Sequence, residues 1–366
     1  MVERHTDTSE NATSAVTTLV YRRRRRSPRR HTTHPDLSVR GAVGRPRNVL
    51  IWRGTRSDMD TNHNATVLDA IGATPLIEID GVYAKLEYLN PSGSIKARMA
   101  RYIIERAERE GLLHRGDTIV EASSGNTGNA MSMVAAVKGY RMLVIMPEGL
   151  SSERAAISTA FGAELRTIGT FHVNDALDEA DRLGSQPGYF APHQFSNEWN
   201  IEENRTWLGP EILAQLPPGR PPDAFIMGVG TGGTLIGVGQ AFRSANPSAL
   251  VVALEPAESS TIVCGDIALH RIEGISDGFV PPIYQRNAEL VDRVISVHSD
   301  DAVAEMRRLA RVHGILVGPS SGANLVVARQ VLADLPAGAI VVTIFPDEGE
   351  KYLSEYFAVG EVSPNR

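Results

Sequence analysis

The sequence predicts an α/β protein with two mainly parallel, twisted sheets covered by helices. From about residue 65 onward, short apolar runs alternate with helical stretches. Such alternation is typical of parallel strands joined by right-handed helical crossovers. The length of 366 residues suits two lobes, and a hydrophobic fraction of 42% is enough for a sizeable core.

Each expected element follows from its own local pattern. Runs of apolar residues predict strands at 83–88, 118–120, 141–146, 164–168, 224–229, 250–254, 293–297 and 339–345, and a further short strand at 315–317. Helical periodicity predicts helices at 96–109, from the loop 123–128 to 138, and at 152–161, 173–183, 235–245, 299–313 and 323–335. These elements are expected to form one folded unit over residues 61–358, with a larger lobe at about 61–98 and 200–358 and a smaller mobile lobe at about 99–199.

Residues 1–60 are expected to be a disordered Arg-rich arm, and residues 359–366 a tail. The arm lacks apolar periodicity and contains the basic run Arg22–Arg30. A solvated tail is the preferred interpretation over binding to nucleic acid or an anionic surface, because no aromatic residues are interleaved with the charges.

Cysteine usage and hydropathy indicate a cytoplasmic protein that does not enter a membrane. Cys264 is the single cysteine, which excludes a disulfide framework and a multi-cysteine metal site, so no metal is expected. No uninterrupted apolar stretch approaches twenty residues.

Lys96 is the leading candidate catalytic residue. The chain has only four lysines against 33 arginines. A Schiff base with an aldehyde cofactor needs a primary amine that can lose its proton, which arginine cannot supply. Lys96 follows a Pro/Ser/Gly loop and opens an expected helix, whereas Lys85 lies in an expected strand and Lys138 at an expected helix end. An ordinary surface lysine is the alternative interpretation of Lys96.

The loop Gly228–Thr234 has the pattern of a phosphate-binding turn, since it follows an apolar strand and opens a helix. Gly228, Gly230 and Gly233 also match the dinucleotide fingerprint, and Glu255 ends the next strand. An NAD-binding Rossmann oxidoreductase is therefore an alternative, although it gives no role to Lys96.

Two further loops have two interpretations each. Gly318–Gly322 matches the G-x-S-x-G pattern, but the hydrolase arrangement needs a histidine after the serine, and His313 is the last histidine. That loop is left as a turn or a cofactor contact. Ser123–Gly128 combines hydroxyls, an amide and a helix N-terminus, which suits an α-carboxylate as well as an ordinary capped turn.

Together these segments resemble the cysteine synthase and cystathionine β-synthase family, the fold-type II enzymes that use pyridoxal 5′-phosphate. The resemblance covers roughly residues 65 to 355. Its segments are, in chain order, Gly72–Leu76, Asn90–Arg98, Ser123–Gly128, Gln194–Asn197, Thr206–Glu211, Gly228–Thr234, Gly318–Gly322 and Pro346–Asp347.

The resemblance implies a role for each site residue. Lys96 would bind the cofactor covalently and later move the substrate's α-proton. Asn126 would contact the cofactor's 3-hydroxyl, and Ser320 its pyridine nitrogen. The residues implied for the phosphate are Gly230, Thr231, Gly232, Gly233 and Thr234, and those implied for the substrate are Ser123, Ser124, Thr127, Gln194 and Gly274.

The implied reaction is β-replacement by a transferase. An activated serine, O-phosphoserine or O-acetylserine, would lose its β-substituent to give an aminoacrylate, and thiosulfate or sulfide would add to give S-sulfocysteine or cysteine. Serine/threonine dehydratase-type β-elimination is an alternative. So is a catalytically silent binding protein tethered by the arm to nucleic acid or to serine acetyltransferase. The resemblance also implies a homodimer.

The chain departs from the family pattern at two places, and the second of them leaves substrate choice open. Ala97 stands where relatives usually have aspartate, and Gly274–Gly278 replaces the small residues common in the loop that closes over the substrate. These departures favour an S-sulfocysteine synthase type. Arg271, near this loop, is expected to meet an anionic leaving group or sulfur donor, with a surface arginine as the alternative.

Overall fold

The computed structural model describes residues 65–123, 125–148, 152–170 and 174–357. The predicted arm, residues 1–60, and the predicted tail, residues 359–366, lie outside these residues. Chain contacts group Asn62–Arg366 into one compact unit.

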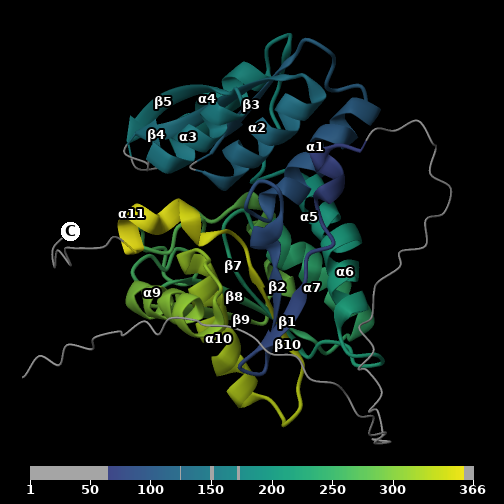
Figure 1. Ribbon diagram of the computed structural model, residues 1–366, viewed down its shortest axis with the longest axis vertical. Helices are drawn as coiled ribbons and strands as arrows, with labels where there is room; N and C mark the ends of the chain where they lie inside the picture. The colour runs from purple at the N-terminus through teal and green to yellow at the C-terminus, as the bar shows by residue number, and fades with distance from the viewer. Residues whose placement is uncertain (1–64, 124, 149–151, 171–173, 358–366) are drawn as a thin grey trace, which may run out of the picture. The chain divides into compact units, whose positions relative to one another are not determined.

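The larger sheet has six strands in the order β1-β2-β10-β7-β8-β9 (Figure 1). Its strands are β1 (Leu76–Ile79), β2 (Val82–Leu86), β10 (Val341–Phe345), β7 (Ala224–Gly228), β8 (Leu250–Pro256) and β9 (Arg293–Val297). β1 and β2 form an antiparallel hairpin, and all other neighbours are parallel. The central strands β7 and β10 are buried at every position, as expected for a sheet covered on both faces.

The smaller sheet has four parallel strands in the order β5-β4-β3-β6. They are β5 (Glu164–Thr170), β4 (Arg141–Glu148), β3 (Thr118–Ala122) and β6 (Tyr189–Phe190). All four lie within the range predicted for the smaller lobe. The division into two lobes, and the mobility of the smaller one, remain predictions.

Helices pack on both faces of each sheet. The helices are α1 (Lys96–Arg109), α2 (Asn126–Lys138), α3 (Ser152–Ala160), α4 (Asn174–Gly184), α5 (Glu198–Glu203), α6 (Gly209–Gln215), α7 (Gly233–Ala245), α8 (Pro282–Arg286), α9 (Ser299–Arg308), α10 (Pro319–Asp334) and α11 (Leu353–Tyr356). On the larger sheet, α10 contributes to the core of one face and α7 to the core of the other. α2 and α4 contribute to the two cores of the smaller sheet. The predicted α/β architecture is therefore confirmed.

The carboxyl ends of parallel strands place the loops that carry the candidate residues. β3 leads through residues 123–125 into α2, and β7 leads through the glycine turn into α7. Ligands of parallel α/β sheets bind at such strand ends, beside helix N-termini.

Several element boundaries differ from those predicted. β2 ends at Leu86 and is followed by a 3-10 turn, Glu87–Leu89, where the prediction continued the strand. α10 begins at Pro319 rather than residue 323, because proline is well suited to the first turn of a helix. α9 ends at Arg308 and continues as a π turn, Leu309–His313. At the expected strand 315–317 the structure has a single bridge, between Val317 and Glu348.

Within the described residues, no helix is both long and apolar enough to span a bilayer.

Candidate active site

Lys96 differs from the other lysines in what its amino group contacts. Three of the four amino groups are bound to side chains: Lys85 to Glu211 at 2.6 Å, Lys138 to Glu108 at 2.8 Å and Lys351 to Asn126 Oδ1 at 3.0 Å. Lys96 Nζ has no hydrogen-bond or ion-pair partner among the described residues, and its side chain lines a cavity. Of the four lysines, Lys96 is the one available for covalent chemistry.

The surroundings of Lys96 favour its neutral amine. Burial lowers the pKa of the amino group below that of an ordinary lysine, although the carboxyl groups of Asp277, Glu203 and Glu121, where ionised, oppose this effect. The side chain is still partly accessible because it opens into the cavity. A neutral amine is the nucleophilic form, so this environment suits bond formation with an aldehyde.

The cavity is lined by loops that follow strands of both sheets. Besides Lys96, its lining residues are Ile95, Ser123, Gly125, Asn126, Thr127, Gln194, Phe195, Met227, Gly228, Gly230, Thr231, Gly232, Thr234, Leu235, Glu273, Gly274, Ile275, Asp277, Ser320, Pro346, Asp347 and Tyr352. Most of the residues proposed from sequence as site residues are therefore gathered around one space.

The glycine turn between β7 and α7 is shaped for a phosphate. Gly232 caps α7 at φ +87°, a conformation that favours glycine. A Cβ on Gly230 would lie 2.5 Å from the carbonyl oxygen of Gly274. The backbone N–H groups of Thr231, Gly232 and Thr234 have no partner among the described residues. Unpaired donors at a helix N-terminus attract an anion.

The loop before α2 offers a second set of donors. Ser123 Oγ accepts the N–H groups of Gly125 at 3.1 Å and Gly128 at 2.9 Å, which fixes the turn. The N–H groups of Asn126 and Thr127 have no partner among the described residues. Thr127 Oγ1 donates to Gln194 Oε1 at 2.6 Å, so these two side chains hold each other in the cavity wall. This arrangement suits a carboxylate.

Asn126 is fixed in orientation by charged partners on both sides. Its Nδ2 donates to Asp347 Oδ2 at 2.8 Å, and its Oδ1 accepts from Lys351 at 3.0 Å. Tyr352 donates to the same oxygen of Asp347 at 2.5 Å. The amide keeps one N–H and one lone pair for a ligand.

Ser320 lies in the first turn of α10, after Pro319, and lines the cavity. Its hydroxyl has no hydrogen-bond partner among the described residues. The group available to a ring nitrogen from α10 is therefore a neutral hydroxyl and not a carboxylate.

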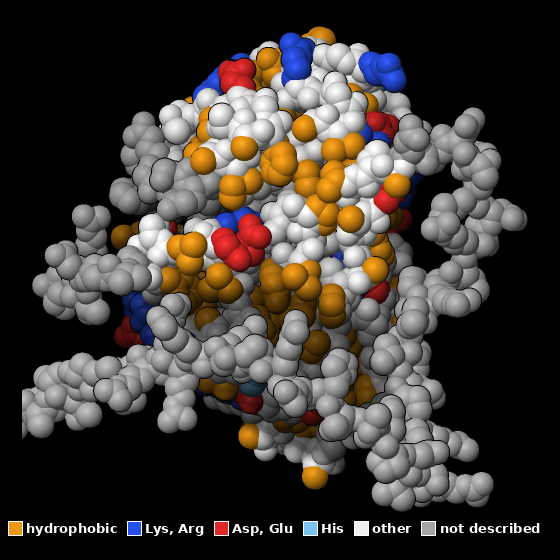
Figure 2. Space-filling view, viewed as in Figure 1, with side chains coloured by type: hydrophobic (Ala, Val, Ile, Leu, Met, Phe, Trp, Pro, Cys, Tyr) orange, Lys and Arg blue, Asp and Glu red, His pale blue; other side chains and the backbone are white. Residues whose placement is uncertain are grey.

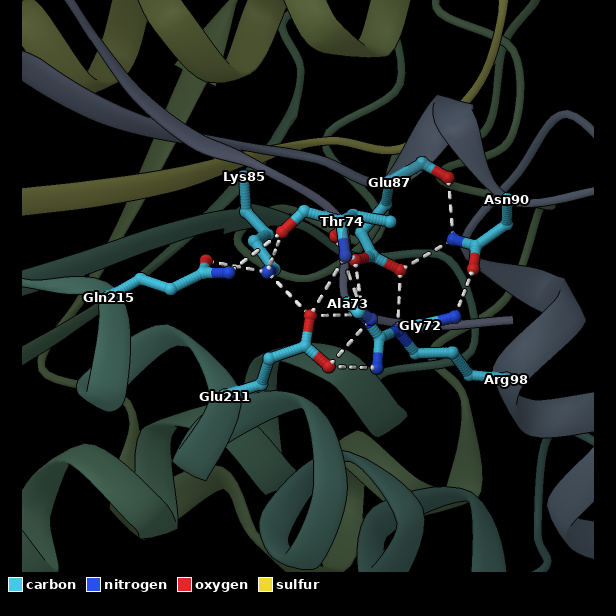
Figure 3. A network of polar contacts seen from close by, with 9 residues as sticks. All are labelled: Gly72, Ala73, Thr74, Lys85, Glu87, Asn90, Arg98, Glu211 and Gln215. Atoms are coloured by element: carbon cyan, nitrogen blue, oxygen red, sulfur yellow. Dashed lines mark hydrogen bonds and ion pairs between the residues drawn. The ribbon is translucent and has the colours of Figure 1, made fainter. Parts of the chain in front are cut away.

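A buried polar network holds the start of α1 (Figure 3). Arg98, two residues after Lys96, binds Glu87 through Nε at 2.7 Å and Nη2 at 2.8 Å. Its Nη1 and Nη2 also bind Glu211 at 2.9 and 2.8 Å. Lys85 Nζ completes the network on Glu211. Two cations and two carboxylates balance, which makes burial of all four tolerable.

Opposing effects act on the carboxyl of Glu211 in this network. Burial disfavours its ionisation, but hydrogen bonds from Arg98 and Lys85 outweigh burial and lower its pKa to about 2. Glu211 also accepts the N–H groups of Ala73 at 3.1 Å and Thr74 at 3.1 Å. The network thereby connects α6 and the 72–74 loop to the helix that begins at Lys96.

Three residues proposed from sequence are not placed in the cavity wall. Ser124 lies outside the described residues. Gly233 packs against Asn200, whose Oδ1 would lie 2.1 Å from an added Cβ, and does not line the cavity. The expectation that Arg271 meets a leaving group is not supported by its position. Its half-exposed side chain pairs with Asp300 and is absent from the cavity lining.

Sequence reasoning missed several carboxyl groups that are buried or line the cavity, among them Asp277, Glu121 and Glu203. Asp277 lines the cavity, and burial raises the pKa of Glu121 and of Glu203 to about 8. Asp277 lies in the segment Gly274–Gly278 that the sequence had marked as unusual, which was the available signal. Glu121 and Glu203 gave none, because a carboxyl in a strand or helix usually faces solvent.

The dinucleotide interpretation of the glycine turn requires Glu255 to contact a ribose, and the position of Glu255 does not allow this. Glu255 accepts the backbone N–H groups of Ile262 at 2.7 Å and Val263 at 3.2 Å. It does not line the cavity, so it has no path to a ribose there. A buried lysine amine, a glycine turn with unpaired N–H groups, a fixed amide and a hydroxyl instead fit pyridoxal phosphate.

Comparisons with known proteins agree with this assignment. Residues 67–347 match the family model of the pyridoxal-phosphate dependent enzymes. A cysteine synthase of Staphylococcus aureus (strain N315) is 43% identical over 297 residues, which cover 79% of this chain and 95% of that protein.

Two solved structures are similar over most of their length. O-ureido-L-serine synthase has a TM-score of 0.76 and 36% identity, and the match covers 82% of this chain and 98% of that one. The O-acetylserine-dependent cystathionine β-synthase of Helicobacter pylori has a TM-score of 0.76 and 33% identity, covering 81% and 99%. This chain therefore belongs to the pyridoxal-phosphate-dependent enzyme family, among the fold-type II enzymes of the cysteine synthase and cystathionine β-synthase group.

Proposed function

We propose that this enzyme catalyses a β-replacement on an activated serine, with a sulfur nucleophile, to give cysteine or S-sulfocysteine. The observation that carries the proposal is the position of Lys96. Its amine is the one lysine amine without a partner among the described residues, and it lies in a cavity that also contains a phosphate cradle and a carboxylate-binding turn. The names of the similar proteins support the reaction type, since they include a cysteine synthase and an O-acetylserine-dependent enzyme.

Each part of the cavity has a proposed role. When bound, pyridoxal phosphate withdraws electrons from the substrate's Cα. The amine of Lys96 takes the α-proton and later returns it. The N–H groups of Asn126 and Thr127, with the side chain of Gln194, hold the α-carboxylate. Ser320 meets the pyridine nitrogen with a neutral hydroxyl, which limits protonation of the ring and favours departure of a β-substituent.

The cofactor is proposed to be oriented by three contacts besides Lys96. The glycine turn 230–234 binds the phosphate through its N–H groups, and Asn126 meets the ring's 3-hydroxyl with the donor or acceptor that Asp347 and Lys351 leave open. Because the Asn126 amide is held on both sides, it can position the ring without losing rotational freedom on binding.

Product analysis tests the proposed function. The purified holoenzyme is incubated with O-acetylserine or O-phosphoserine, each with sulfide or thiosulfate, and products are identified by mass. The proposal requires cysteine or S-sulfocysteine from at least one pair. Formation of pyruvate alone would identify a β-eliminating dehydratase instead, and no consumption of either serine derivative would support a silent binding protein.

Association and location are proposed on the family resemblance. Hydrophobic side chains gather across the middle of the face shown in Figure 2, around a small group of charged ones. Such a surface is suited to burial between copies of the chain, which supports a homodimer. Sedimentation of the holoenzyme alone tests the homodimer. Sedimentation with serine acetyltransferase tests whether the two enzymes form a complex. Cell fractionation tests the proposed cytoplasmic location.

A further inference from the structure

The segment Gly274–Gly278 carries a carboxylate into the cavity. Glu273, Gly274, Ile275 and Asp277 all line the cavity. Asp277 also lies close enough to Lys96 to interact electrostatically with its amine. Its carboxylate therefore belongs to the same space in which the substrate reacts.

The position of Asp277 is fixed by the residue before it. Ser276 adopts φ +54°, an unusual conformation for a residue with a side chain. Its N–H donates to Val229 O at 2.9 Å, and its Oγ donates to Ser259 O at 3.1 Å. Its carbonyl oxygen lies 3.2 Å from His270 Nε2. Contacts at three atoms of Ser276 hold a strained backbone, and such strain is found where a side chain must be aimed.

The histidine contact has one consistent protonation pattern. His270 Nδ1 accepts the N–H of Ile272 at 3.2 Å, so the proton of the neutral ring is on Nε2. Nε2–H then donates to the carbonyl of Ser276. His270 is thereby a support of the segment and not a proton donor to the substrate.

The segment also packs directly on the phosphate cradle. The carbonyl oxygen of Gly274 would lie 2.5 Å from a Cβ at Gly230, and Ile275 Cγ2 would lie 2.8 Å from a Cβ at Gly228. Both glycines are in the cavity wall. Asp277 is therefore fixed relative to the cofactor's phosphate site and not merely near it.

The charge of the cavity wall is one-sided. Among its described lining residues, Lys96 is the one cation, while Glu273, Asp277 and Asp347 carry carboxyl groups and no arginine or histidine is present. Asp347 is engaged by Asn126 and Tyr352. Once Lys96 is bonded to the cofactor, the described lining residues include no other positively charged side chain. An anion other than the substrate carboxylate and the cofactor phosphate would therefore find no cation there.

We propose that Asp277 accepts the proton of the incoming nucleophile and thereby selects a nucleophile that carries a proton on its attacking sulfur. Hydrogen sulfide and neutral thiols belong to this class, whereas thiosulfate, a dianion without such a proton, does not. This inference rests on the proposed β-replacement and deepens it, because it names the class of the second substrate.

The proton transfer balances in a simple way. Lys96 first takes the α-proton, and the bond between Cβ and the leaving-group oxygen then breaks, with its electron pair leaving on the oxygen. The sulfur then bonds to Cβ while its S–H bond breaks and the proton passes to the Asp277 carboxylate. Lys96 returns the α-proton to Cα. The proton on Asp277 passes to solvent, so the net products are the thioether or thiol amino acid, the free leaving group and one proton.

Electrostatics supports the selection against dianions. A carboxylate at a fixed, partly buried position repels a doubly charged nucleophile more strongly than it would in bulk water. The same argument disfavours a phosphate leaving group relative to a neutral acetyl ester. O-acetylserine with sulfide or a thiol is thus the preferred pair.

Comparing Asp277→Asn with Asp266→Asn tests the inference. Asp266 is an exposed aspartate of the same segment between β8 and α8, so its replacement makes the same change of charge away from the cavity. With O-acetylserine, rapid mixing separates acetate release from the sulfide-dependent step. Binding of thiosulfate to each holoenzyme is measured separately, by the change in cofactor fluorescence.

The expected result is a split between the two half-reactions. Asp277→Asn should leave acetate release within a few-fold of wild type and slow the sulfide-dependent step by about 100-fold or more. It should also tighten thiosulfate binding, while Asp266→Asn changes neither. Equal rates and thiosulfate affinities in the two variants would overturn the inference, as would a wild-type enzyme that prefers thiosulfate to sulfide. If wild-type enzyme releases no acetate and forms no product, the proposed function has failed instead.

Discussion

Arg98 and Glu211 lie 113 residues apart in the chain and are joined inside the protein by two hydrogen bonds of 2.9 and 2.8 Å (Figure 3). Arg98 belongs to the helix that begins at Lys96, and Glu211 to α6. The pair fixes the first turn of α1 against α6. The direction of the Lys96 side chain therefore depends on a contact that is distant in sequence.

Replacing Arg98 should strongly destabilise the folded protein. Arg98→Met leaves Glu87 and Glu211 without their shared guanidinium, and breaking a buried ion pair in this way lowers the free energy of unfolding by about 3–5 kcal/mol. Denaturant titration of the holoenzyme measures this. Arg293→Met is the matched control, since it removes an exposed pair with Asp334 and should cost about 0–1 kcal/mol. Equal losses in the two variants would contradict the structural role of the network.

Glu203 should make stability depend on pH in one direction. Burial raises its folded pKa to about 8, and neither of its oxygens has a hydrogen-bond partner among the described residues. Between the ordinary glutamate pKa and about pH 8, the unfolded chain loses this proton while the folded protein keeps it. The folded state then binds more protons than the unfolded state, so stability falls as pH rises through this window.

Glu203→Gln should remove that contribution. The variant is expected to gain on the order of 1–3 kcal/mol relative to wild type at pH 8, and much less at pH 5. Denaturant titrations at the two pH values measure the difference. Glu202→Gln changes the neighbouring carboxylate, which pairs with Arg106 at the surface, and should not alter the pH dependence. A Glu203→Gln variant with the same pH dependence as wild type would refute the assignment of a buried, protonated carboxyl.

Asn126→Asp should weaken cofactor binding. The substitution replaces the N–H donor to Asp347 with a second acceptor. Two carboxyl oxygens would then face each other where Asn126 Nδ2 and Asp347 Oδ2 are now 2.8 Å apart. One must become protonated or move, and the loss corresponds to about a tenfold to hundredfold rise in the dissociation constant of pyridoxal phosphate. Fluorescence titration of apoenzyme measures it. Asn197→Asp, at the N-cap of α5, should bind the cofactor normally because aspartate caps a helix as well as asparagine.

Gly230→Ala should disturb both the phosphate cradle and the segment that holds Asp277. Its Cβ would lie 2.5 Å from the backbone oxygen of Gly274, which cannot rotate away as a side chain could. The expected result is at least about a tenfold loss of cofactor affinity. Gly188 also has a positive φ, +82°, but no atom lies within 4 Å of an added Cβ. Gly188→Ala should therefore lower stability through backbone strain and leave cofactor affinity unchanged. Similar cofactor affinities in these two variants would argue against close packing at Gly230.

Local pattern was enough to predict the α/β alternation, the lysine and the glycine turn. Lys96 could be singled out because its lead-in loop and helix are contiguous in sequence, and the cradle because its glycines lie within seven residues. The start of α10 was misplaced, since Gly318–Gly322 has the composition of a turn although Pro319 suits the first turn of a helix. The region 198–215 was not predicted, because its helical turns are short and interrupted by a π turn.

Contacts between distant residues could not be predicted in the same way. Asn126 is held by Asp347 across 221 positions, and nothing in either local sequence indicates the pairing. The pairing of Arg271 with Asp300 could not be predicted for the same reason, because Asp300 lies on a different element. Asp277 is placed in the cavity by hydrogen bonds of Ser276 to three separate segments, which no spacing rule expresses.

The most direct test of the central claim is borohydride reduction of the holoenzyme followed by peptide mapping. Reduction makes the bond between cofactor and lysine permanent, so the modified peptide identifies the residue. The structure predicts that the label is found on Lys96 alone, and that Lys96→Ala holoenzyme takes up none. A label on Lys85, Lys138 or Lys351, or no label on wild-type enzyme, would contradict the account.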